Sequence, residues 1–127
     1  MFRDHLDTFS DHLIEKSSLC DTYLIPGKNL EKILNWYGEE RLRSFKAISK
    51  FSPSFTDLDN RDEYYEHMIL WDPIKFKLIG GQRFTFNIDN YDGKNSYLEN
   101  YHSGLYIHLK KKNLPFAEIG RTFIMPD

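Results

Sequence analysis

The chain has 127 residues, which is enough for one domain and too few for two independent hydrophobic cores. Hydrophobic residues make up 40% of it and aromatic residues 16%, which excludes a disordered chain, and no apolar run approaches the roughly 20 residues of a membrane span. The net charge of −2 argues against a general nucleic-acid binder, and the single cysteine, Cys20, excludes an internal disulfide and a multi-cysteine zinc site.

The first half of the chain reads as helix, strand, helix. Ser10 can cap a short helix that ends near Leu19, because acidic and spaced apolar residues follow it. Residues 21–25 are typical of a strand, which a Pro-Gly pair closes. Apolar residues at approximate helical spacing predict a long helix over about 29–48, with an interruption at Gly38 left open.

The second half predicts a hairpin, a short helix and a last strand. An acidic loop, residues 52–63, precedes strands over 66–71 and 76–87, which the turn residues Asp72-Pro73 separate as in an antiparallel hairpin. Three further segments follow, namely a polar, irregular stretch (90–104), a short helix (105–112) and a final strand (116–125).

This order of elements predicts an α/β or α+β fold with helices on the faces of a sheet. If the final strand lies at a sheet edge, its backbone N–H and C=O groups must be covered or paired with another chain. A homodimer or a missing C-terminal half would each achieve this.

Charged residues gather in four places. In the predicted long helix, Arg41 and Arg43 lie two residues apart and so on different faces, which predicts that one faces solvent and the other turns inward. Three carboxylates and an imidazole follow near the start of a strand: Asp57, Asp59, Asp62 and His67. Both groups are therefore candidates for a site.

The other two places lie within predicted strands. Gly80-Gly81 interrupts an apolar strand just before Arg83, and paired glycines in a strand predict a bulge or a ligand close to the backbone. Glu118 and Arg121 put opposite charges into the final strand, where buried charges need partners. Ordinary surface charge stays open as the alternative for these strand residues, and a solvated turn as the alternative for the carboxylates.

Other site chemistries find little support in the sequence. A hard divalent cation could use the loop carboxylates, but the spacing of an EF-hand loop is absent and the five histidines form no zinc-binding pattern, so we expect no metal site. There is no nucleophile elbow and no glycine-rich phosphate loop. The one basic run, Lys110-Lys111-Lys112, is typical of a solvated helix end.

Four motifs stand in order along the chain: Arg41-x-Arg43-x-Phe45, Asp57-x-Asp59-x-x-Asp62 with His67 five residues further, Gly80-Gly81-Gln82-Arg83, and Glu118-Ile119-Gly120-Arg121. Together they resemble the acyltransferases of the GNAT-like superfamily, in particular the hemolysin-like, ornithine-lipid N-acyltransferase branch, which His67 favours. Acyl-homoserine lactone synthases share much of the pattern. The resemblance covers roughly residues 20–127.

The resemblance implies an α/β fold, an αβ sandwich around a splayed and mostly antiparallel sheet. It also implies transfer of a fatty acyl group from acyl carrier protein or acyl-CoA to the amine of an amino acid such as ornithine, with no permanently bound cofactor. Glu118 is then the expected base or base organiser, and Arg121 is the second expected catalytic residue.

The same resemblance assigns binding roles to nine residues: Arg41, Arg43, Phe45, Phe51, Asp57, Asp59, Asp62, His67 and Arg83. Asp59 and Asp62 would hold the cationic acceptor, and Phe45 and Phe51 would wall its pocket. Arg41, Arg83 and Arg121 would pair with those carboxylates and with any carboxylate of the acceptor.

In such acyltransferases the strand corresponding to residues 116–125 leads into a glycine-containing turn that holds the donor pyrophosphate. This chain stops before that turn, so we expect residues 1–127 to be a single, partial domain, truncated after its central strand. Two alternatives stay open, a non-catalytic half-domain that acts as a dimerisation or partner-binding module and a signal synthase that uses S-adenosylmethionine.

The expected partners follow from the same resemblance. They are acyl carrier protein and a small amine or amino-acid acceptor. A second copy of the chain, in a homodimer, is expected instead from the uncovered edge of the final strand. We expect no nucleic acid and no membrane span, although association with a membrane surface stays open. The first residues show no secretory signal pattern, which favours a cytoplasmic location.

Overall fold

The computed structural model describes residues 1–48, 57–86, 97–113 and 116–127. Its elements follow the order η1 Phe2–His5, η2 Ser10–His12, β1 Leu13–Lys16, β2 Asp21–Pro26, η3 Gly27–Asn29, α1 Leu34–Ile48, β3 Glu66–Asp72, β4 Lys77–Phe86, α2 Tyr97–Tyr101, α3 Ser103–Lys112 and β5 Ala117–Ile124. The η elements are short 3-10 helices. The predicted α/β class is confirmed. No helix within the described ranges is long and apolar enough to cross a bilayer.

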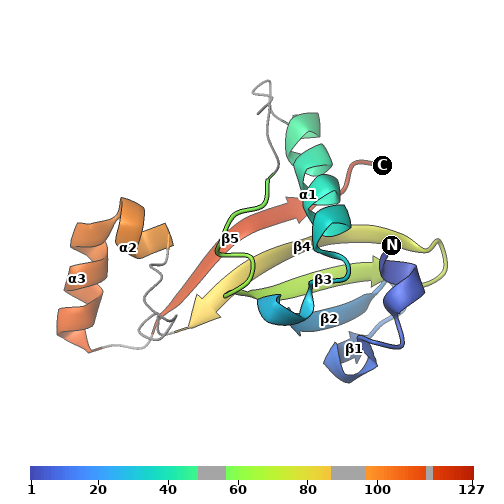
Figure 1. The fold of residues 1–127 in the computed structure, drawn as a ribbon, viewed down its shortest axis with the longest axis horizontal. Helices are drawn as coiled ribbons and strands as arrows, with labels where there is room; N and C mark the ends of the chain where they lie inside the picture. The colour runs from blue at the N-terminus through green and yellow to red at the C-terminus, as the bar shows by residue number, and fades with distance from the viewer. Residues whose placement is uncertain (49–56, 87–96, 114–115) are drawn as a thin grey trace.

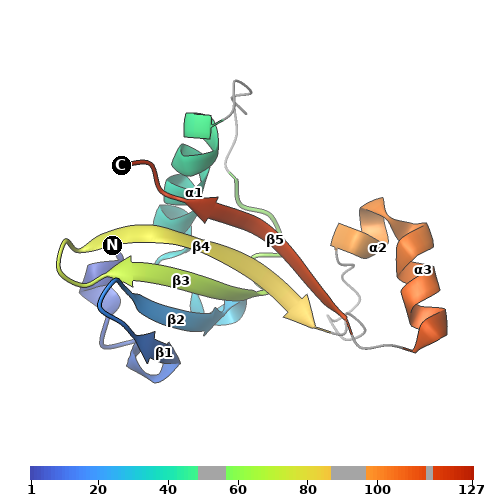
Figure 2. The ribbon, with the colours of Figure 1, turned by 180° about the vertical axis from the view of Figure 1, so that it is seen from behind.

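The strands form one antiparallel sheet in the order β1-β2-β3-β4-β5, with β5 at an edge. Helix α1 lies against one face of this sheet, and α2 and α3 stand together at one end of it (Figure 1). Figure 2 shows the opposite face, over which no helix of the described residues lies. The molecule is therefore a two-layer α/β arrangement that buries one sheet face.

The hydrophobic core lies between that face and a layer formed by α1 and the N-terminal residues. Phe2 is fully buried, and its ring packs edge-on against Tyr23 at 5.1 Å and against Trp71 at 5.0 Å between ring centroids. Alternate residues of β3 are buried on the same side, as expected for a strand with one covered face. The N-terminal residues thus cover the part of the sheet that α1 does not reach.

The predicted hairpin is confirmed as β3 and β4, and the predicted strands at residues 21–25 and 116–125 and the helix at 105–112 are also present. The Asp72 carboxylate closes the hairpin turn by accepting the backbone N–H groups of Ile74 and Lys75, each at 2.9 Å. The bulge predicted at Gly80-Gly81 is present as well, because the register between β4 and β5 shifts between Gly81 and Arg83.

Two predictions in the first half need correction. The helix predicted from Ser10 to Leu19 is wrong, since only Ser10–His12 form a 3-10 turn and β1 follows it. Pairing with β2 gives these backbone groups an alternative to a helix, and tertiary pairing overrides a weak local preference. The long helix begins at Leu34 instead of residue 29.

Gly38 does not interrupt that helix. A Cβ at this position would lie 2.5 Å from the Leu58 side chain, so the glycine lets the acidic loop pack directly against α1. The described part of the acidic loop, residues 57–63, contains turns and no strand, as predicted. The two residues that follow it, 64 and 65, continue this loop up to the start of β3. The irregular stretch predicted at 90–104 is wrong for residues 97–101 and 103–104, which are helical, while residues 90–96 lie outside the described part.

Candidate active site

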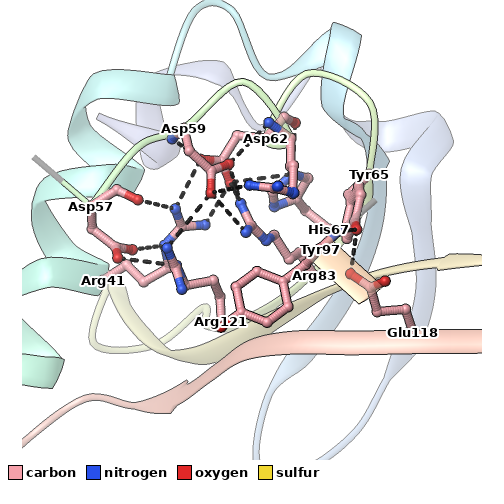
Figure 3. Close-up of polar contacts among 11 residues, drawn as sticks. Arg41, Asp57, Asp59, Asp62, Tyr65, His67, Arg83, Tyr97, Glu118 and Arg121 are labelled. Atoms are coloured by element: carbon pink, nitrogen blue, oxygen red, sulfur yellow. Dashed lines mark hydrogen bonds and ion pairs between the residues drawn. The ribbon is translucent and has the colours of Figure 1, made fainter. Parts of the chain in front are cut away.

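The side chains of the candidate site come from α1, from the acidic loop, and from β3, β4 and β5 (Figure 3). Strand register places His67 opposite Arg83, and Arg83 opposite Gly120, so three neighbouring strands present residues in one row. The acidic loop closely approaches Gly27, the first residue of η3 directly after β2, where any Cβ would collide with the carbonyl oxygen of Asp62. This close approach brings the loop carboxylates onto the row of strand residues.

Arg41 is the central cation of the site and is fully buried. Its guanidinium binds Asp62 through both ends, with Nη1 at 2.8 Å and Nη2 at 3.0 Å from the two carboxylate oxygens. Its Nε–H donates to the carboxylate of Asp57, and its Nη2 also donates to the carbonyl of that residue at 3.0 Å. Such a bidentate, charge-assisted pair fixes both partners in orientation as well as in distance.

Arg83 reaches the same carboxylates from β4. Its Nη1 and Nη2 lie 2.6 Å and 3.0 Å from the two oxygens of Asp59, and Nη1 lies 3.1 Å from Oδ1 of Asp62. Asp62 is 1% exposed and is therefore shared between two arginines in the interior. The burial of Asp62 tends to raise its pKa, but the hydrogen bonds and charges of Arg41 and Arg83 outweigh burial and lower the pKa to about 2.

Arg121 completes the set from the edge strand. Its Nε lies 3.1 Å from Asp57 Oδ1 and its Nη2 lies 3.6 Å from Asp59 Oδ2. Its backbone φ of 51° lies in the left-handed region, beside the register shift between β4 and β5. Side chains other than glycine rarely adopt this conformation, and here it accompanies a side chain aimed at the acidic loop. With 34% of its side chain exposed, Arg121 is the most solvent-accessible arginine among these three.

His67 lies beneath this cluster and is fully buried. Its Nε2–H donates to the backbone carbonyl of Asp62 at 2.8 Å, and its Nδ1 has no hydrogen-bond partner among the described residues. Burial, aided by the positive charges of Arg41 and Arg83, lowers the pKa of His67 to about 4. The ring is therefore neutral near pH 7 and contributes no charge to the cluster.

Glu118 forms a second polar group beside the cluster. One of its carboxylate oxygens accepts the phenol O–H of Tyr65, and the other accepts the backbone N–H of Leu98 at 3.0 Å. The Arg83 guanidinium lies 5.2 Å from the centroid of the Tyr65 ring and so connects the two groups (Figure 3). The arrangement places a partly buried carboxylate next to a fixed set of guanidinium groups.

A family model of the acetyltransferase (GNAT) domain matches residues 40–127, which is more than half of the chain. The chain belongs to the GNAT family. No curated protein and no solved structure matches it. The GNAT match contains both polar groups, and domains of this family use acyl-CoA as donor and need no permanent cofactor. Membership of this family indicates acyl transfer as the class of chemistry for the chain.

The structure brings together most of the candidate site residues that the sequence singled out. The pairing predicted between the three arginines and the loop carboxylates is present, and Arg41 is the inward-facing member of its pair. Arg43 points to solvent and pairs with Glu40 at 2.5 Å on the same helix, apart from the cluster. Phe45 packs against Phe123 at 6.2 Å between ring centroids, at the margin of the core. Phe51 lies outside the described residues.

The sequence does not predict several contributors to this candidate site. Tyr65 binds Glu118, and the guanidinium of Arg61 lies over the rings of Tyr97 and Tyr101 at 5.6 Å and 5.8 Å. The adjacent tyrosines at 64 and 65 give no signal that separates one from the other, because the side that each faces depends on the path of the acidic loop. Only the structure gives the path of this loop and shows that Tyr65 contacts Glu118.

The described residues contain no group of three or more His, Cys, Asp or Glu side chains that could hold a metal ion. The loop carboxylates are instead occupied by arginines. A separate pocket of about 400 Å³ opens beside α1 and shares none of the cluster residues; it is lined by Gly27, Lys28, Glu31, Leu34, Asn35 and Glu63.

Proposed function

We propose that the chain is an N-acyltransferase-like domain of the hemolysin-like, ornithine-lipid branch of the GNAT family. It moves a fatty acyl group from acyl carrier protein or acyl-CoA to the amine of an amino acid such as ornithine. The observation that carries the proposal is the position of Glu118 on the same strand as Arg121, beside arginines that the loop carboxylates hold in place.

The reaction requires the acceptor amine to lose a proton as it attacks the thioester carbonyl carbon. A C–N bond forms, the C–S bond breaks, and the products are an amide and a thiol. Glu118 takes the proton from the nitrogen, directly or through a water, and the departing sulfur finally receives it. Holding amine and thioester together supplies much of the remaining rate.

Exposure divides the binding roles among the charged residues. Asp62 is enclosed and doubly bound by arginines, so its role in this proposal is to hold Arg41 and Arg83 in place. Arg121, with its partly exposed guanidinium, binds the carboxylate of the acceptor. Asp59, 25% exposed, receives the second positive charge of a diamino acid. This division supports an acceptor that carries a carboxylate and two amines.

The test is a mass-spectrometric acyl-transfer screen with long-chain acyl-CoA and acyl carrier protein as donors and ornithine, lysine, glycine and serine as acceptors. We expect an N-acyl product whose rate of formation falls at least about a hundredfold in Glu118→Gln. Glu39→Gln, an exposed change of the same kind on α1, is the matched control and should keep the full rate. Putrescine, which lacks the carboxylate of ornithine, should be a poor acceptor. A wild-type chain without product contradicts the proposal.

A second candidate function, a non-catalytic dimerisation or partner-binding module, is favoured by one feature of the sheet. Strand β5 lies at its edge, and the apolar side chains of Phe86, Ile119 and Ile124 are 62%, 62% and 65% exposed on and beside that strand. Unpaired strand edges and exposed apolar residues promote association. A concentration-dependent dimer in sedimentation experiments, together with no binding of acyl donor, would support this function. A monomer at all concentrations would contradict dimerisation, and binding of acyl donor would contradict the non-catalytic module.

A further inference from the structure

We propose that Tyr65 is a positioning residue for Glu118 and that it couples this carboxylate to helix α2. The inference rests on the proposed function, because it gives Glu118 a role in proton transfer. It goes further by assigning a role to a tyrosine that belongs to none of the four sequence motifs.

A chain of hydrogen bonds runs from α2 through the phenol to the carboxylate (Figure 3). The backbone N–H of Tyr97 donates to the phenol oxygen of Tyr65 at 3.2 Å, and the phenol O–H donates to Oε1 of Glu118. The other carboxylate oxygen accepts the N–H of Leu98 at 3.0 Å. Both oxygens of Glu118 therefore meet a donor, which fixes the plane of the carboxylate.

Tyr65 is itself held at both ends. Its backbone N–H donates to the carbonyl of Arg61 at 2.9 Å, and its carbonyl accepts the N–H of Gly27 at 2.8 Å. Its ring lies under the guanidinium of Arg83, and the residue is 2% exposed. Burial and the hydrogen bond to Glu118 raise the pKa of the phenol above its usual value, so it stays a donor at every pH at which the enzyme would work.

This support matters because a glutamate side chain has three rotatable bonds and Glu118 sits on an edge strand. An ionised carboxylate has about four lone-pair positions, and the two donors occupy two of them. The remaining positions point in fixed directions and can accept a proton from an amine held in one orientation. Loss of the phenol O–H would leave the carboxylate with the Leu98 N–H as its single donor, so its plane would no longer be fixed, which lowers the rate without removing the base.

The first experiment compares Tyr65→Phe with wild type in the acyl-transfer assay. We expect kcat to fall about tenfold or more while KM for the acyl donor changes less than about twofold, because the lost interaction orients the base and does not bind the donor. Tyr23→Phe, which removes a phenol O–H from the core beside Phe2, is the matched control and should leave both constants unchanged. An unchanged kcat in Tyr65→Phe overturns the proposal.

The double variant Tyr65→Phe/Glu118→Gln separates positioning from an independent effect on folding. If the phenol acts through the carboxylate, the double variant is no slower than Glu118→Gln alone. If the two losses multiply, the residues act independently and the proposal is wrong.

Amide hydrogen exchange tests the same network without any substrate. The N–H of Tyr97 lies in the first turn of α2, where helices offer no internal acceptor, so the Tyr65 oxygen is what protects it. We expect about tenfold faster exchange of the Tyr97 N–H in Tyr65→Phe, which removes the oxygen that accepts it. Unchanged exchange refutes the coupling to α2. Faster exchange in a protein that makes no product supports the positioning contact and overturns only the proposed function.

Discussion

His67 makes the stability of the fold depend on pH in a way that can be calculated. The ring is 0% exposed and lies under the buried pair of Arg41 and Asp62. Burial lowers its pKa to about 4, whereas an unfolded chain returns it to about 6.5. Protonation of His67 would add a third buried charge beside Arg41 and Asp62, whose opposite charges already compensate each other.

The sign follows from proton counts in the two states. Between about pH 6.5 and pH 4 the unfolded chain binds a proton at His67 and the folded chain does not, so stability falls as the pH falls. The contribution is fully present above pH 6.5. From pH 7 to pH 4.5 the loss is about 2 kcal/mol. Asp62, whose pKa is about 2 in the folded state, stays ionised there throughout this range.

Urea unfolding at pH 7 and pH 4.5, followed by the fluorescence of the buried Trp71, measures this loss. The reference is His67→Gln, whose side-chain amide can still donate to the carbonyl that His67 binds. Contributions of all other groups are common to both chains and cancel in the comparison. The wild type should lose about 2 kcal/mol more than the variant between the two pH values. Equal losses would show that His67 is not held neutral by its surroundings.

Two further predictions concern packing and charge around the site. Arg41→Met leaves Asp62 buried without its bidentate partner and should lower the free energy of unfolding by about 3–5 kcal/mol in urea, while the exposed Arg43→Met should stay within about 0.5 kcal/mol of wild type. If both variants lost the same free energy of unfolding, the Arg41–Asp62 pair would not be buried. Gly81→Ala puts a Cβ 2.6 Å from the carbonyl of Met68 and should cost about 1–3 kcal/mol, whereas a Cβ at Gly120 meets no described atom within 4 Å. A stable Gly81→Ala with a normal melting temperature would contradict the tight approach of β3 to β4.

The sequence predicts the parts of this fold in which local pattern and tertiary structure agree. The hairpin turn at Asp72 and the glycine bulge before Arg83 are encoded in a few adjacent residues, and both are present. The segment from Ser10 has a cap and a spacing that predict a helix, while its pairing with β2 is a long-range interaction that no local pattern shows. For short segments with weak periodicity, tertiary contacts determine which secondary structure forms.

For the site, the sequence predicts charged residues that need partners and leaves open which partner each one finds. Two arginines at i and i+2 on a helix must point to different sides, so one buried and one exposed guanidinium could be anticipated. The sharing of Asp62 between Arg41 and Arg83 could not be anticipated, because it depends on the path of the acidic loop across three strands. The contact of Glu118 with α2 depends in addition on how α2 sits beside the start of β5.

The charge balance of the site bears on the kind of acceptor that it suits. The described cluster pairs four arginines, Arg41, Arg61, Arg83 and Arg121, with three aspartates, Asp57, Asp59 and Asp62, so it carries one net positive charge. So small a net charge gives little long-range steering of a charged ligand. Recognition then depends on short-range contacts with groups that reach solvent, and Arg121 and Asp59 are the most exposed members of the cluster. One guanidinium and one carboxylate side by side complement a molecule that itself carries both charges, as the amino-acid acceptor of the proposed function does.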